Sequence, residues 1–228
     1  MPDRIRIIGH RGAPGSAPEN TIRSFRRAQD VGADEVELDI RLSADGHLVV
    51  VHDATVDRTT DGTGTVAELT LAQLQALDAG AGERIPTYAE VLAAIELPVQ
   101  TEIKAIEAVP AFAALVRRER LADRVCAASH HAEILAAVRD AVPEVPRALI
   151  LPASPPDAVD QARAVGAAWL ALGIRDLTED LVRKVHDAGI AIDAWPVPDR
   201  DTLARARALG VAAVTTDNPH LLAEPSAV

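Results

Sequence analysis

A regular alternation of short apolar runs with alanine-rich segments of helical spacing constrains the fold of this chain more than any other feature. Strands that alternate with helices predict a parallel sheet covered by helices, and apolar strands fit burial on both faces. The segments of helical spacing are 20–31, 107–120, 131–141, 156–165, 178–188 and 200–209. The nine apolar runs are 4–9, 35–42, 47–52, 99–104, 124–128, 147–151, 169–172, 190–195 and 212–216.

The connection at 43–46 decides how the nine runs are arranged. A parallel crossover needs a dozen or more residues, and this connection has about four. Its Asp45-Gly46 pair is also a strong hairpin signal, so 47–52 should run antiparallel to the run before it. Eight parallel strands then remain and predict a (β/α)8 TIM barrel, although 228 residues is slightly below the usual length of about 250. An open doubly wound sheet is the alternative.

The register of this hairpin predicts which polar residues approach one another. A turn centred on Asp45 places Asp39 opposite Val51. His52 then returns to the level of Glu37 and Asp39, near the C-terminal end of the second barrel strand. Barrel enzymes carry their chemistry at that end of the strands.

The stretch that follows the hairpin departs from the strand–helix alternation. It contains the turn-rich sequence DRTTDGTGTV and one helical run around 71–77. We interpret this stretch, at about 53–86, as an insertion over the barrel mouth. Together with the insertion, residues 1–228 are predicted to form one domain.

Composition and charge exclude several classes of partner. The chain has 23 Lys and Arg against 34 Asp and Glu, and its net charge of −11 is unfavourable for binding nucleic acids or anionic membranes. It contains no apolar run of about 18 residues, we expect no secretory signal, and its single cysteine, Cys126, cannot form an internal disulfide. We therefore expect a cytoplasmic protein that acts on a small molecule, without nucleic acid or stable membrane association. The oligomeric state stays open.

Three carboxylates near strand ends are candidate metal ligands. Glu37 and Asp39 lie two residues apart in one strand and therefore face the same way. Two adjacent buried carboxylates repel each other and are costly to desolvate, and a divalent cation that prefers oxygen ligands, Mg²⁺ or Ca²⁺, removes both costs. Glu102, which shares a strand face with Lys104, could supply a third oxygen. The structural alternatives are salt bridges to arginines and an internal Glu102–Lys104 pair.

Two histidines accompany these carboxylates. His10 and Arg11 follow the first strand between two glycines, which suits a tight turn that exposes both side chains. His52 is followed by Asp53, and a neighbouring carboxylate can orient an imidazole. Each residue alone fits a structural role. Jointly they predict metal-assisted acid–base chemistry on an anion, with phosphorus as the best fit, Arg11 and Lys104 on the anion and the two histidines moving protons.

Other polar residues are expected to be structural. Asn20 or Thr21 should cap the helix that begins near them. No chemistry is assigned to the remaining histidines, which lie at turns or helix ends: His47, His130, His131, His186 and His220.

Short motifs occur along the chain in a specific order. They are HRG at 10–12, PENT at 18–21, ELD at 37–39, DGHLVVVHD at 45–53, RTTDGTG at 58–64, IPT at 85–87 and EIK at 102–104. The joint order and spacing of HRG, ExD, HD and ExK are highly specific, and in them the chain resembles the glycerophosphodiester phosphodiesterases. The resemblance continues more weakly to Trp195 and to TTDNP at 215–219, so it spans nearly the whole chain.

This resemblance implies a fold, an activity and a set of roles. The fold is a (β/α)8 barrel with an insertion after the HD motif, and the activity is hydrolysis of glycerophosphodiesters to sn-glycerol 3-phosphate and an alcohol. The implied roles are one divalent ion on Glu37, Asp39 and Glu102, an acid–base pair of His10 and His52, phosphate binding by Arg11 and Lys104, and a pocket wall from Trp195.

Two departures concern the substrate side. The family often has Phe where this chain has His130, and Thr where it has Pro196. They bear on the preference for the alcohol group of the substrate and leave the chemistry untouched.

Several alternatives stay open at this point. A lysophospholipase D-like or phospholipase C-like enzyme acting on lipids would need an apolar rim, and the aromatic content of 2% argues against one. A catalytically inactive ligand-binding barrel would have lost a catalytic group, and all of them are present. The alcohol group and the native metal stay open. It also stays open which histidine is the acid and which is the base. So does the choice between direct attack by water and a cyclic phosphate intermediate.

Overall fold

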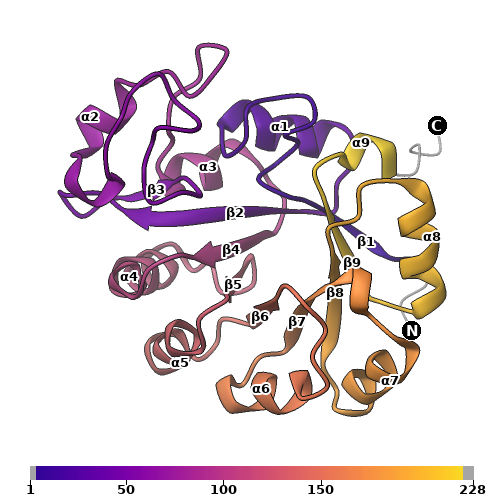
Figure 1. Cartoon of the computed structure of the whole chain (residues 1–228). Coiled ribbons are helices and arrows are strands. Elements are labelled where there is room, and N and C mark those ends of the chain that lie inside the picture. Colours follow the sequence, from indigo (N-terminus) through magenta and orange to yellow (C-terminus); the bar gives the residue numbers. More distant parts are fainter. Residues whose placement is uncertain (1–3, 223–228) are drawn as a thin grey trace.

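Eight parallel strands form a closed barrel in the computed structural model, which describes residues 4–222 (Figure 1). Strand β1 pairs with both β2 and β9, so the first and last strands close the sheet. This closure confirms the predicted (β/α)8 barrel and excludes the open doubly wound sheet. The barrel strands are β1 (Arg6–Gly9), β2 (Glu35–Leu42), β4 (Val99–Ile103), β5 (Val125–Ser129), β6 (Arg147–Leu151), β7 (Trp169–Gly173), β8 (Ala191–Trp195) and β9 (Ala213–Thr216).

Helices surround this barrel, as the ring of coiled ribbons in Figure 1 shows. Two clusters of buried apolar side chains fill the space between strands and helices, one around Phe25 and Phe112 and the other around Leu170 and Val185. The α-helices are α1 (Ile22–Asp30), α2 (Leu71–Gln75), α3 (Tyr88–Ala94), α4 (Val109–Glu119), α5 (Ala132–Ala141), α6 (Ala158–Val165), α7 (Glu179–Asp187), α8 (Arg200–Leu209) and α9 (Pro219–Leu222). The 3-10 helices are η1 (Val66–Glu68), η2 (Ile106–Ala108) and η3 (Ile174–Asp176).

The one remaining strand of the sheet, β3 (Leu48–Val50), lies outside the barrel and runs antiparallel to β2. The backbone N–H of Val51 donates to the carbonyl of Asp39 over 3.0 Å, which is the predicted register. The strand is shorter than the run 47–52, so His52 lies beyond its end. The hairpin is thus confirmed, and it delivers His52 to the barrel mouth.

Helix α3 was not predicted from the sequence. It begins after Thr87, whose hydroxyl accepts a hydrogen bond from the backbone N–H of Glu90, while the Glu90 carboxylate accepts from that of Thr87. This capping box is a sequence-level signal that could have identified the helix. The first helical residue, Tyr88, is fully buried and its hydroxyl bonds to that of Thr101 in β4 over 2.7 Å. Helix α3 therefore serves as the helix of the second strand–helix unit.

The segment 53–86 packs around a small cluster of its own. Val56 and Leu74 are fully buried and pack with Val49 of β3. The helix predicted around 71–77 is present as α2. In Figure 1, α2 lies at the periphery of the molecule, beside β3 and away from the ring of barrel helices.

Two further expectations concern the extent of the domain and membrane-spanning helices. The ends of the predicted domain, residues 1–3 and 223–228, lie outside the described part. Within 4–222, no helix combines the length and the apolar character that crossing a membrane requires.

Candidate active site

A pocket of about 130 Å³ lies at the C-terminal ends of the barrel strands. Six of the eight predicted site residues line it, and the other two, Asp39 and Lys104, contact lining residues. Small side chains such as Ala128, Ala148 and Ala171 form part of the inner face of the barrel and leave room for polar groups. The six lining residues are His10, Arg11, Glu37, His52, Glu102 and Trp195.

The three predicted metal ligands converge. Strands β2 and β4 pair with Asp39 opposite Glu102, and Glu37 lies two residues earlier on the same face. One oxygen from each carboxylate lies within 4.8 Å of the others, and all three residues are buried. Burial, with Asp39 nearby, raises the pKa of Glu37 to about 8. A set of buried carboxylate oxygens suits a hard divalent cation, which would offset this repulsion, so the residues fit the predicted ion.

Cations and an amide also contact this cluster. The Lys104 ammonium lies 2.7 Å from a Glu102 oxygen and 2.9 Å from an Asp39 oxygen, and the Asn20 amide donates to Asp39 over 2.9 Å. Although burial opposes it, Lys104 and Arg11 hold the pKa of Asp39 below its usual value. The ion pairs expected of a purely structural cluster are therefore present. They supply two cations for three carboxylates, so the cluster carries net negative charge for a metal once Glu37 is ionised.

The loop after β1 presents Arg11 to the site. Arg11 has a φ of 50°, which is unusual for a residue with a side chain, and its backbone N–H donates to Glu37 over 3.0 Å. Gly12, with a φ of 91°, lies so close to Ser24 of α1 that a Cβ would clash. The expectation that Asn20 or Thr21 caps α1 is resolved in favour of Thr21, whose hydroxyl accepts from Ser24.

A carboxylate holds His10 in place. Its Nδ1 lies 2.6 Å from Asp217, which follows β9, and its Nε2 lies 3.9 Å from Glu37. The hydrogen bond to His10 lowers the pKa of Asp217, so this carboxylate is ionised and Nδ1 is the donor. Burial opposes protonation of His10, but Asp217 and Glu37 outweigh it and raise the pKa of the imidazole. Asp217 was not among the predicted site residues.

The arrangement around His52 is analogous. Its Nδ1 lies 2.6 Å from Asp53, whose pKa is held well below its usual range by hydrogen bonds from Arg58. The ionised Asp53 can only accept, so Nδ1 of His52 donates. Both candidate catalytic histidines therefore leave Nε2 free to exchange protons.

One part of the pocket wall comes from β8 and from the residue that follows β5. The rings of His130 and Trp195 meet edge to face with centroids 6.3 Å apart, and His130 Nε2 lies 3.7 Å from Glu102. The buried Nε1 of Trp195 has no hydrogen-bond partner among residues 4–222, so it can donate to a bound molecule. No chemistry was assigned to His130 from the sequence, but it was expected on the substrate side. The structure places it in the lining of the pocket.

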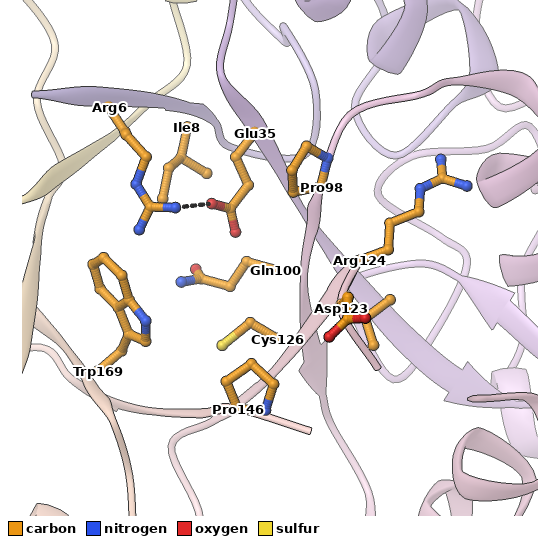
Figure 2. Close-up of a pocket in the computed structure, with 11 residues that line it drawn as sticks. Arg6, Ile8, Glu35, Pro98, Gln100, Asp123, Arg124, Cys126, Pro146 and Trp169 are labelled. Carbon is orange, nitrogen blue, oxygen red and sulfur yellow. Dashed lines mark hydrogen bonds and ion pairs between the residues drawn. The ribbon is translucent and has the colours of Figure 1, made fainter. Parts of the chain in front are cut away.

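A second cavity, of about 130 Å³, is lined by residues at or near the N-terminal ends of the barrel strands, which include Arg6, Glu35 and Trp169 (Figure 2). Arg6 pairs with Glu35 over 3.4 Å and stacks 4.4 Å above the ring of Trp169, so these groups satisfy one another. The predicted site residues are all absent from its lining. Chemistry in barrel enzymes is found at the other end of the strands, so the mouth with the histidines is the candidate active site.

Asp193 in β8 is a lining residue that the sequence analysis missed. It is 1% exposed, and burial raises its pKa to about 7, although the Thr215 hydroxyl donates to it over 2.8 Å. The unfolded chain releases this proton near pH 4. Between pH 4 and 7 the folded state therefore holds one more proton than the unfolded state, and stability falls as the pH rises.

Asp193→Asn should remove this pH dependence. At pH 8 the variant is expected to be more stable than the native protein by up to about 4 kcal/mol, and the advantage should shrink towards pH 5. Urea unfolding at both pH values in EDTA measures the difference, with Asp187→Asn on the exposed face of α7 as control. Parallel pH dependences of the native protein and Asp193→Asn would contradict a buried neutral carboxyl.

A protein-family model matches most of the chain. The model of the glycerophosphoryl diester phosphodiesterase family matches residues 10–221. A glycerophosphodiester phosphodiesterase of Caldanaerobacter subterraneus is 35% identical over 231 residues, which cover 95% of each chain. Another, from Bacillus subtilis, is 31% identical and covers 96% of this chain and 86% of its own.

Solved structures give the same result. A phosphodiesterase of Oleispira antarctica, in complex with the product sn-glycerol-3-phosphate, superposes with a TM-score of 0.90 at 28% identity over 94% of each chain. A glycerophosphodiester phosphodiesterase of Agrobacterium tumefaciens superposes with a TM-score of 0.84 at 30% identity, over 97% of this chain and all of its own.

Proposed function

The chain belongs to the glycerophosphoryl diester phosphodiesterase family and is a phosphoric diester hydrolase, and we propose that it uses one divalent cation and two histidines to convert glycerophosphodiesters into sn-glycerol 3-phosphate and an alcohol. The convergence of the buried carboxylates and two carboxylate-bound histidines on one pocket is the observation that carries this proposal. A relative that holds sn-glycerol-3-phosphate supports the product.

The two histidines divide the proton transfers. Nε2 of one takes a proton from the attacking oxygen as its bond to phosphorus forms, and Nε2 of the other gives a proton to the alcohol oxygen as its bond to phosphorus breaks. The roles suit His10 and His52 because both line the pocket and both use Nδ1 to bind a carboxylate. Those carboxylates, Asp217 and Asp53, stabilise the imidazolium that each transfer requires.

The remaining polar groups bind the phosphate. Glu37, Asp39 and Glu102 would hold Mg²⁺ or Ca²⁺, which supplies positive charge next to the phosphate when bound. Arg11 lines the pocket, and its planar guanidinium can donate two hydrogen bonds to phosphate oxygens. Lys104, which pairs with Asp39 and Glu102, adds a second cation at the same edge of the pocket.

The direct test is release of sn-glycerol 3-phosphate from glycerophosphocholine. Activity is expected with Mg²⁺ or Ca²⁺ and should be lost in EDTA. Lysophosphatidylcholine micelles in a parallel assay distinguish the lipid-acting alternative, for which turnover of the micelles should exceed that of the water-soluble diester. A folded protein that binds the cation and releases no product from a panel of glycerophosphodiesters would support the inactive ligand-binding barrel and contradict the proposal.

A further inference from the structure

A continuous series of ion pairs connects His52 to Arg11. His52 Nδ1 lies 2.6 Å from Asp53, and the other oxygen of Asp53 accepts from Nε of Arg58 over 2.6 Å. Two further nitrogens of Arg58 donate to the two oxygens of Glu19, each over 2.8 Å. Glu19 in turn accepts from the Arg11 guanidinium over 2.9 Å. One guanidinium thus joins the carboxylate that orients a histidine to the carboxylate that orients the phosphate-binding arginine.

An ordinary surface ion pair contributes little to stability, because water easily replaces its one flexible contact. The contacts of Arg58 differ from such a pair. Arg58 engages both Asp53 and Glu19 with two nitrogens each, so the planar fork fixes both carboxylates. It also supplies the positive charge between two carboxylates that would otherwise repel each other. Its removal would affect both ends of the series together.

The loop that carries Arg58 is itself held in place. Val56, two residues earlier, is fully buried in the cluster of the segment 53–86, and its carbonyl accepts from the backbone N–H and the hydroxyl of Thr60. The Asp57 side chain accepts from the backbone of Gly64 over 3.1 Å. Arg58 therefore approaches Asp53 and Glu19 from an anchored turn outside the strand–helix units.

We propose that Arg58 is a positioning residue, which holds His52 and Arg11 in their working orientations through Asp53 and Glu19. This inference rests on the proposed function for the roles of the two residues it holds. It gives the segment 53–86 a part in the reaction although none of its side chains lines the pocket.

The test compares Arg58→Met with Arg58→Lys. Methionine keeps the length of the side chain and removes the charge, whereas lysine keeps the charge but cannot bind two carboxylates with a planar fork. The expected order of kcat on glycerophosphocholine is native, then Lys, then Met, with a loss of about 10- to 100-fold in Arg58→Met, as for other residues that orient a functional group.

Arg84→Met is the matched control. Arg84 lies in the same segment, is similarly exposed and pairs with Glu90 away from the pocket. It should retain kcat within about twofold, because surface pairs contribute little. A kcat for Arg58→Met that equals that of the control would overturn the proposal, and if the Met variant fails to fold, the same comparison is made with Arg58→Lys and Arg84→Lys.

A second readout does not depend on activity. In the metal-free protein, the proton that Nδ1 of His52 donates to Asp53 should give a low-field NMR signal, and a second signal should come from the pair of His10 and Asp217. Arg58→Met should shift or broaden the first signal and leave the second unchanged. Unchanged signals would show that Arg58 does not position His52. A native protein without phosphodiesterase activity that still shows this selective shift would refute the proposed function and retain the positioning role.

Discussion

Replacing Glu102 with glutamine is expected to lower kcat by at least about 100-fold while the barrel stays folded. Glu102 supplies one of three carboxylate oxygens that lie within 4.8 Å of one another, and a neutral amide is a much weaker ligand for a hard cation. Addition of Mg²⁺ or Ca²⁺ should raise the Tm of the native protein, because a ligand that binds only the folded state stabilises it. The variant should show little of this rise. Steady-state kinetics and thermal unfolding with and without the cation measure both effects.

Glu107→Gln is the control for this substitution, since Glu107 is exposed in η2. It should match the native protein in kcat and in the rise of Tm. Native-like turnover of Glu102→Gln in EDTA would show that the three carboxylates do not hold a cation that the reaction needs.

The second large effect is expected at the histidines. His10→Ala and His52→Ala should each lower kcat/KM by about 100-fold or more, because in the proposed mechanism each removes a proton donor or acceptor from the transition state. The double variant should lose far less than the product of the two single losses, since the two side chains act in one step. The three variants and the native protein form a double-mutant cycle that can be measured on glycerophosphocholine.

His47→Ala serves as the control because His47 is half exposed at the hairpin turn, where its nearest charged contact is Asp45 at 4.0 Å. Its kcat/KM should stay at the native value. A single variant of His10 or His52 with near-native turnover would assign that histidine to the structure of the pocket rather than to proton transfer.

Most of the fold follows from local pattern. β2, β6 and α8 lie at the predicted bounds, because polar or turn residues delimit each of these segments. The antiparallel pairing of β3 with β2 follows from the short connection at 43–46. Helix α3 was not predicted, because its apolar pattern is short and its capping signal, Thr87 with Glu90, was not used.

The candidate site was predictable where it depends on one strand or on neighbouring strand ends. Glu37 and Asp39 share a strand face, and Glu102 follows from the pairing of β2 with β4. Asp217 and Arg58 were missed because their contacts depend on the closure of the barrel and on the path of an irregular turn. No local spacing in the sequence encodes either.

Closure of the barrel by β1 and β9 also depends on residues that are synthesised late. All eight predicted site residues except Trp195 have been made by residue 104, yet Asp217, the partner of His10, lies 207 residues after it. Until 213–217 leave the ribosome, β1 lacks one of its two neighbours and His10 lacks its carboxylate. A nascent chain that lacks 213–217 carries all eight predicted site residues without the closed barrel, and we expect it to have no phosphodiesterase activity.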